Sequence, residues 1–134
     1  MDKKELAIEL HKNKFNCCQS VVCAFSREVN VDEQILFRAG EAFGLGMGCM
    51  ECTCGALSGA MLLAGFKNSD GNLDSPATKA ETYKLTKEMV VRFKEKTGSC
   101  VCKELKGIET GKLLCSCPDC IRYGVEVAQE VLGL

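Results

Sequence analysis

The chain has 134 residues, of which 46% are hydrophobic and 26% charged, and its formal net charge at pH 7 is −1. This near-neutral balance gives no positive field that would attract nucleic acid or an anionic membrane surface, so neither is expected as a partner. The longest apolar stretch, 56–66, is about half of the ~20 residues that a membrane span needs, which argues against insertion. The length and apolar content suit one domain, residues 1–134, with a core of its own.

Cysteine is the unusual component, with 11 in the chain. An odd number cannot be closed by internal disulfides, and the first residues lack the apolar segment and cleavage site of a secretory signal. We therefore expect a reducing, cytoplasmic location, where thiols bind soft metals or exchange electrons. The cysteines form four groups: Cys17, Cys18 and Cys23; Cys49, Cys52 and Cys54; Cys100 and Cys102; and Cys115, Cys117 and Cys120.

Three short helices are predicted before the middle of the chain. Asp2 is a suitable N-cap for a helix that ends near Asn13, Asn16 for a second helix and Asp32 for a third. Apolar residues at helical spacing predict the inward faces of the second and third helices. These residues are Cys18, Val21, Val22, Phe25 and Val29, followed by Ile35, Leu36, Ala39 and Phe43.

A glycine-rich loop follows, in which every second residue can turn tightly or approach a bulky group. Its glycines are Gly44, Gly46 and Gly48. The next helix is expected over Thr53–Phe66. Gly55 and Gly59, four residues apart, remove side chains from one face of this helix, so that another helix or a cofactor can come close.

The longest helix is predicted to begin at Ser75-Pro76 and to end near Lys96, before Gly98. Its buried face is expected to consist of Leu85, Met89 and Phe93, with Tyr83 and Val90 beside them. Cys117-Pro118 begins a last helix with Ile121, Val125, Ala128 and Leu132 at helical spacing. No segment shows the alternation of a strand, so the predicted fold class is all-α, a compact bundle of about five to six helices with Cys/Gly-rich loops.

Three cysteines lie at or near predicted helix N-termini: Cys17, Cys54 and Cys117. Free backbone N–H groups and the helix dipole stabilise a thiolate there and lower its pKa below the ordinary ~8.5. Several such thiolates directed at one point would suit an iron–sulfur cluster. The alternative is that a small residue is merely tolerated next to an N-cap.

Two CxxC spacings offer other chemistry. Cys117-Pro-Asp-Cys120 begins a helix, but no strand precedes it as in thioredoxin-like active sites. Cys49-Met-Glu-Cys52 lacks the second ligand pair of a zinc finger. A thiol–disulfide oxidoreductase would use Cys117 with Cys120, or Cys54 with Cys52.

The remaining candidates have plainer interpretations. Cys18 and Cys23 are expected to be packed thiols on the second helix. His11 is the only histidine and is expected to be solvated, which leaves little basis for a histidine-activated nucleophile.

Five sequence elements resemble, in this order, those of a known family. They are Asn16–Val21, Phe43–Gly48, Cys54–Gly59, Cys102–Gly107 and Cys117-Pro118. Nearly the whole chain is similar to the C_GCAxxG_C_C family of redox-active proteins, which is related to a domain of split-Soret cytochromes associated with an iron–sulfur centre. The resemblance implies a small helical protein with four characteristic cysteines, Cys17, Cys54, Cys102 and Cys117, and no firmly assigned activity.

The chain also departs from the family pattern. Relatives commonly carry an arginine and a glutamate in the run before the Cys54 position, where this chain has additional cysteines. The additional sulfurs are Cys49, Cys52, Cys100, Cys115 and Cys120. We expect them to enlarge the cluster site or to allow disulfide exchange beside it.

The sequence therefore predicts an iron–sulfur protein for electron transfer or redox sensing, rather than a metabolic enzyme. The cluster ligands would be Cys17, Cys54, Cys102 and Cys117, with Cys49, Cys52 and Cys120 as further metal-ligand candidates and the Gly44–Gly48 loop as a cover. A thiol–disulfide oxidoreductase using Cys52, Cys54, Cys117 or Cys120 is the first alternative, and a structural zinc or soft-metal protein is the second. The expected partner is a redox protein, and a homodimer is left open.

Overall fold

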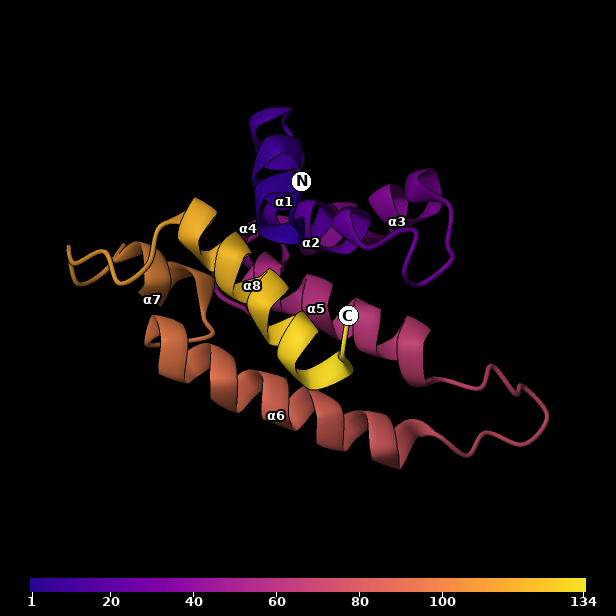
Figure 1. Ribbon diagram of the computed structural model, residues 1–134. Coiled ribbons are helices and arrows are strands. Elements are labelled where there is room, and N and C mark those ends of the chain that lie inside the picture. Colours follow the sequence, from indigo (N-terminus) through magenta and orange to yellow (C-terminus); the bar gives the residue numbers. More distant parts are fainter.

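The computed structural model describes residues 1–134 and is built from helices (Figure 1). The elements are α1 (Lys3–Lys12), α2 (Cys17–Ala24), α3 (Glu33–Gly40), the 3₁₀ turn η1 (Glu41–Phe43), α4 (Gly44–Met47), α5 (Gly55–Asn68), α6 (Lys79–Thr97), α7 (Cys102–Lys106) and α8 (Cys117–Leu132). The one β-type contact is an isolated antiparallel bridge between Thr53 and Val101. The all-α prediction is confirmed, and none of the helices is both long and apolar enough to cross a membrane.

Side-chain caps explain where several helices begin. Asp2, Asn16, Asp32 and Ser116 each accept a hydrogen bond from a backbone N–H in the first turn. Asn16 forms a full capping box, because Gln19 Oε1 also accepts from the Asn16 N–H at 2.9 Å. The predicted starts of the first three helices are therefore confirmed.

The predicted start of the longest helix is wrong: α6 begins at Lys79, and Ser75 and Pro76 lie in the preceding loop. Asn72 Oδ1 accepts from the N–H groups of both Asp74 and Ser75, at 3.1 and 3.0 Å. This side chain holds the backbone in a turn, so it competes with a helix start at Ser75.

Helices α5 and α8 form the centre of the bundle. α8 packs on α5 and also contacts α1 on one side and α6 on the other, while α2 packs on α5 (Figure 1). One cluster of buried apolar side chains connects these helices. Its fully buried members include Val21, Phe25, Leu57, Leu63, Phe93, Ile121 and Val125.

Glycines allow the central helices to approach closely. A Cβ atom on Gly59 of α5 would lie 2.9 Å from the Cys18 carbonyl oxygen of α2. A Cβ atom on Gly124 of α8 would lie 2.8 Å from the Ala56 carbonyl oxygen of α5. The partner that comes close to the Gly55 and Gly59 face is therefore helix α2.

Some predicted inward faces are wrong. Ile35 is 58% exposed, Ala39 is also exposed, and Tyr83 is 64% exposed. α3 packs mainly on α2, and its buried residues are Leu36 and Gly40. The buried face of α3 is therefore narrower than the face predicted from its apolar residues. Val29 lies beyond the end of α2 and is half-buried.

We predict that Gly59→Ala lowers the free energy of unfolding by about 1–3 kcal/mol, because the added methyl group overpacks the contact between α5 and α2. Gly65→Ala is the matched control in the same helix, since its Cβ would have no neighbour within 4 Å. The control should be stabilised by about 0.5–1 kcal/mol through loss of glycine flexibility. Urea unfolding of the reduced proteins measures both changes, and equal stability of the two variants would contradict the proposed helix contact.

Candidate functional site

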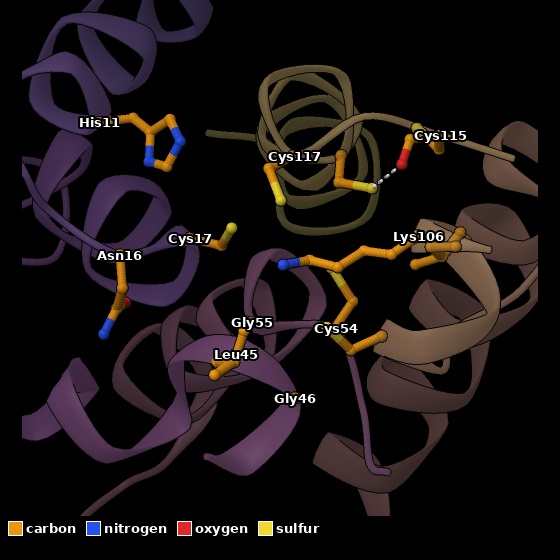
Figure 2. A pocket seen from close by; sticks show the side chains of 13 residues that line it. His11, Asn16, Cys17, Leu45, Gly46, Cys54, Gly55, Lys106, Cys115 and Cys117 are labelled. Atoms are coloured by element: carbon orange, nitrogen blue, oxygen red, sulfur yellow. Dashed lines mark hydrogen bonds between the residues drawn. The ribbon is translucent and has the colours of Figure 1, made fainter. Parts of the chain in front are cut away.

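Six of the eleven cysteines line one cavity of about 190 Å³ (Figure 2). The cavity lies where α2, α5, α7 and α8 begin, beside the Leu45–Gly46 turn. The lining cysteines are Cys17, Cys54, Cys102, Cys115, Cys117 and Cys120. The other lining residues are His11, Asn16, Leu45, Gly46, Gly55, Leu105 and Lys106. Residues from distant parts of the chain thus place a sulfur-rich surface around one small volume.

Helix starts position the main thiols. Cys17 and Cys117 are the first residues of α2 and α8, and Cys54 is the N-cap residue of α5. The helix expected over 53–66 thus begins two residues later, at Gly55. In these positions the sulfurs lie beside backbone N–H groups that lack helical partners, which favours the thiolate form.

A short pairing of two segments brings Cys54 and Cys102 to the same wall. The Cys54 N–H donates to the Cys100 carbonyl at 2.7 Å, and the Cys102 N–H donates to the Cys52 carbonyl at 3.0 Å. Gly46 lies directly on this wall, because a Cβ atom there would be only 2.5 Å from the Cys102 Cβ. Its φ of +57° is a second reason for glycine at this position.

Cys17 and Cys117 form a thiol–thiolate pair. The Cys17 thiol donates a hydrogen bond to the Cys117 sulfur, and this bond, with help from the charges of Lys106 and His11, lowers the pKa of Cys117 to about 6. The same hydrogen bond, together with burial, raises the pKa of Cys17. The pair therefore favours the thiolate form of Cys117, with the proton kept on Cys17.

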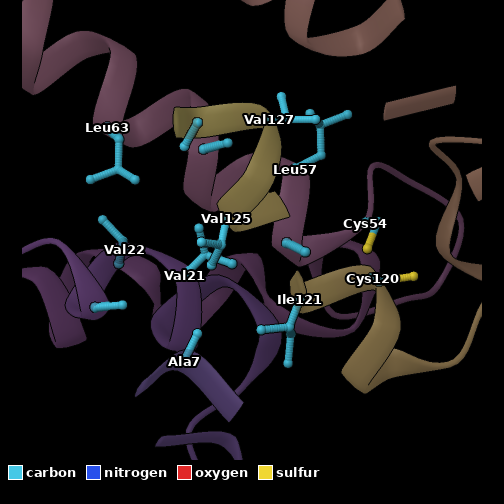
Figure 3. Packing of buried hydrophobic residues seen from close by; sticks show 14 of the residues in the cluster. Ala7, Val21, Val22, Cys54, Leu57, Leu63, Cys120, Ile121, Val125 and Val127 are labelled. Carbon is cyan, nitrogen blue, oxygen red and sulfur yellow. The ribbon is translucent and has the colours of Figure 1, made fainter. Parts of the chain in front are cut away.

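Cys54 and Cys120 form a second pair, at the edge of the packed core (Figure 3). The Cys120 thiol donates to the Cys115 carbonyl at 3.8 Å (Figure 2). Its side chain also lies beside the Cys54 sulfur and lowers the pKa of Cys54, and the N–H groups of Ala56 and Leu57 lower it further. The neighbouring Cys54 sulfur and burial raise the pKa of Cys120. The structure thus brings Cys120 beside Cys54, whereas Cys52 is exposed and does not line the cavity.

The cavity contains no carboxylate, and Lys106 reaches across it (Figure 2). Burial raises the pKa of Cys102 and Cys115, and Lys106 opposes this effect at Cys102.

The prediction that His11 is solvated is wrong: it is half-buried, lines the cavity, and its Nδ1 donates to the Phe15 carbonyl at 2.9 Å. No sequence pattern predicts that His11 or Lys106 lines the cavity. For Cys115 the sequence predicts only an additional sulfur beyond the four characteristic cysteines.

Other candidate residues lie elsewhere. Gly44 packs on the Asn16 side chain, whose Cγ would be 2.5 Å from an added Cβ, whereas Gly48 faces open space. Cys49 and Cys52 are exposed and do not line the cavity.

Cys18 and Cys23 are packed thiols, as predicted. Both are buried on α2, at 0% and 3% exposure. Neither lines the cavity. Burial is the main cause that raises the pKa of each to about 12.

The lining thiols surround a volume and do not converge on one point. No group of three or more His, Cys, Asp or Glu side chains is arranged to hold a single metal ion. The cavity volume is several times the ~30 Å³ that one water molecule occupies in the liquid. Six of the lining side chains are nevertheless thiols, and sulfur ligands prefer soft metals.

The fold and its thiol-lined cavity define a small, cysteine-rich helical protein. Residues 15–131 match the family model described as "Putative redox-active protein (C_GCAxxG_C_C)". The match covers most of the chain, and the protein belongs to this family. No curated protein and no solved structure matches the chain.

We predict that Cys117 of the metal-free, reduced protein is alkylated by iodoacetamide with a pH midpoint near 6, the pKa set by its hydrogen bond from Cys17. Because the pKa is lowered, the reactive thiolate is present above this pH and is lost as the pH falls below it. Cys17→Ala should move the midpoint upward, toward the ordinary ~8.5. Peptide mapping after timed alkylation measures the rate at each cysteine.

Cys18 serves as the internal control for that experiment, since burial raises its pKa to about 12 and it should stay unmodified at pH 7. Alkylation of Cys117 with an unperturbed midpoint, unchanged by Cys17→Ala, would contradict the thiol–thiolate pair.

Proposed function

We propose that the cavity binds an iron–sulfur cluster and that the protein acts in electron transfer or redox sensing. The proposed ligands are Cys17, Cys54, Cys102 and Cys117. The observation that carries the proposal is the gathering of six cysteines around one cavity without a carboxylate. Family membership supports a redox role of the chain as a whole.

The chemistry of the donors fits such a cluster. Iron–sulfur clusters are held by cysteine thiolates, and nearby hydrogen-bond donors tune them. Cys54 and Cys117 have lowered pKa values, which favours the thiolate form at two of the four proposed ligands. Lys106 is placed to offset part of the negative charge that four thiolates would bring.

The distribution of the thiols favours a cluster over a single zinc ion. A structural zinc site needs four donors at about 2.0–2.3 Å from one point. The lining thiols instead surround a cavity, and no three of them share such a point. A cluster has two or more irons among which its cysteine ligands are divided, so these ligands are spread around a volume.

The surroundings of the cavity would protect a bound cluster. When bound, such a group stores and releases an electron. Cys54 and Cys102 are 5% and 6% exposed, and Leu45 and Gly46 form one wall beside them. Exclusion of water from a site of this kind is one of the means by which a protein sets the reduction potential.

A second candidate function is thiol–disulfide exchange inside the cavity. It is favoured by the proximity of the Cys54 and Cys120 thiols, the first of which has a lowered pKa. Oxidation of this pair would form a disulfide with loss of two electrons and two protons. With either function, the expected partner of this protein is another redox protein.

We predict that Cys54→Ser and Cys102→Ala abolish the visible absorption that the parent gains on anaerobic reconstitution with iron and sulfide, because each removes a proposed ligand. Cys23→Ala is the matched control: it deletes a buried sulfur outside the cavity and should keep full absorption, at a stability cost of about 1 kcal/mol. Iron and acid-labile sulfide analysis measures the content of each protein.

The other outcomes identify the alternatives. A parent that binds zinc without sulfide would support a structural metal site. A parent that binds no metal, but in which oxidation joins Cys54 to Cys120 reversibly, would support thiol–disulfide exchange. Equal loss of iron from Cys23→Ala and Cys54→Ser would refute the assignment of the ligands.

A further inference from the structure

Two cysteines lie outside the cavity and on the surface. Cys49 and Cys52 are exposed, whereas the other nine cysteines are buried or half-buried. The Cys49 and Cys52 thiols are neighbours: desolvation and the adjacent Cys49 sulfur raise the pKa of Cys52. A pair of adjacent, accessible thiols is the arrangement that thiol–disulfide exchange needs.

Tight backbone turns bring the two residues together. Met47, Gly48 and Met50 all have positive φ values, of 63°, 82° and 63°. Left-handed backbone is uncommon outside glycine, and it folds this segment back on itself. The Met50 N–H donates to the Leu45 carbonyl at 2.9 Å, which closes the turn.

The pair is anchored to the segment that bears Cys102. The Met50 carbonyl accepts from the Lys103 N–H at 2.9 Å, and the Cys52 carbonyl accepts from the Cys102 N–H at 3.0 Å. The thiols therefore sit on a fixed framework, which reduces the entropy lost when they join.

We propose that Cys49 and Cys52 form a second redox site, a surface dithiol that reduces the disulfide of a low-molecular-weight thiol and becomes an intramolecular disulfide. This site is separate from the proposed cluster cavity and does not depend on it.

The exchange is balanced in two steps. One cysteine, as its thiolate, attacks a sulfur of the substrate disulfide; the substrate S–S bond breaks and the first small thiolate leaves. The other cysteine then attacks the protein sulfur of the mixed disulfide, the Cys49–Cys52 bond forms, and the second small thiolate leaves. The protein dithiol has lost two electrons, the substrate has gained them, and the two thiol protons are taken up by the released thiolates or by solvent.

This dithiol also touches the wall of the cavity. The Cys49 thiol donates to the Gly46 carbonyl at 3.7 Å, and Gly46 lies against Cys102. Oxidation removes the Cys49 thiol hydrogen and with it this contact. The oxidation state of the Cys49–Cys52 pair can therefore affect the Leu45–Gly46 turn. The cavity thiols need not become exposed for this to happen.

The test uses the full chain, fully reduced and freed of reductant, treated with oxidised glutathione, then trapped with acid and alkylated. Mass spectrometry with peptide mapping should find two thiols lost per chain, both in the peptide with Cys49 and Cys52, and no retained glutathione. Cys49→Ser and Cys52→Ser should each lose one thiol there and retain one glutathione. Cys100→Ser, a half-buried cysteine outside the cavity, is the control and should behave as the parent.

Three results would overturn the proposal: a parent whose Cys49 and Cys52 stay reduced, a parent that keeps glutathione on either residue, or a disulfide that joins either residue to a third cysteine. Running the reaction on both metal-free and iron-reconstituted protein separates the two sites. Failure to take up iron would count against the proposed cluster alone, because the surface disulfide is located by its own peptide.

Discussion

The close contact of α2 and α5 is the constraint on which the site depends. A Cβ atom on Gly55 would lie 3.2 Å from the Cys17 Cβ and 3.1 Å from the Cys18 N, so the glycine after Cys54 is what lets two helix starts meet. Gly124 allows α8 to reach α5 in the same manner and brings Cys117 to the same end of the bundle. The fold thus brings the N-termini of several helices to the place where the thiols lie. The packing that brings these helix ends together also favours the thiolate form there.

Several of the cavity cysteines keep their protons, which limits the electrostatic repulsion among many sulfurs in a small, largely buried space. Six thiolates together would repel strongly in surroundings of low polarity. Two neighbouring pairs lessen this repulsion, because Cys17 and Cys120 have raised pKa values and keep their protons beside Cys117 and Cys54, whose pKa values are lowered. The cavity can therefore hold reactive sulfur without an excess of uncompensated charge.

Local signals in the sequence predict the helices well, because caps and helical spacing act within one turn. They fail where a competing local bond or a distant neighbour decides: Asn72 holds the turn before α6, and the neighbours of α3 leave Ile35 exposed. For the site, the cysteines at helix starts were identifiable as a set. The pairing of Cys54 with Cys120, and the presence of His11 and Lys106, depend on how helices from distant parts of the chain cross, which spacing along one chain does not encode.

The origin of the cavity wall in α2, α5, α7 and α8 makes ligand binding inseparable from folding. Cys17 and Cys117 are far apart along the chain and meet only when the central helices are packed, so the unfolded chain has no comparable site. By mass action, any ligand of the cavity then adds RT ln(1 + [L]/Kd) to the stability of the native state, about 2.7 kcal/mol at a hundredfold excess over Kd. Chain turnover would consequently follow the supply of that ligand: molecules left without it would unfold, and be degraded, more readily than those that carry it.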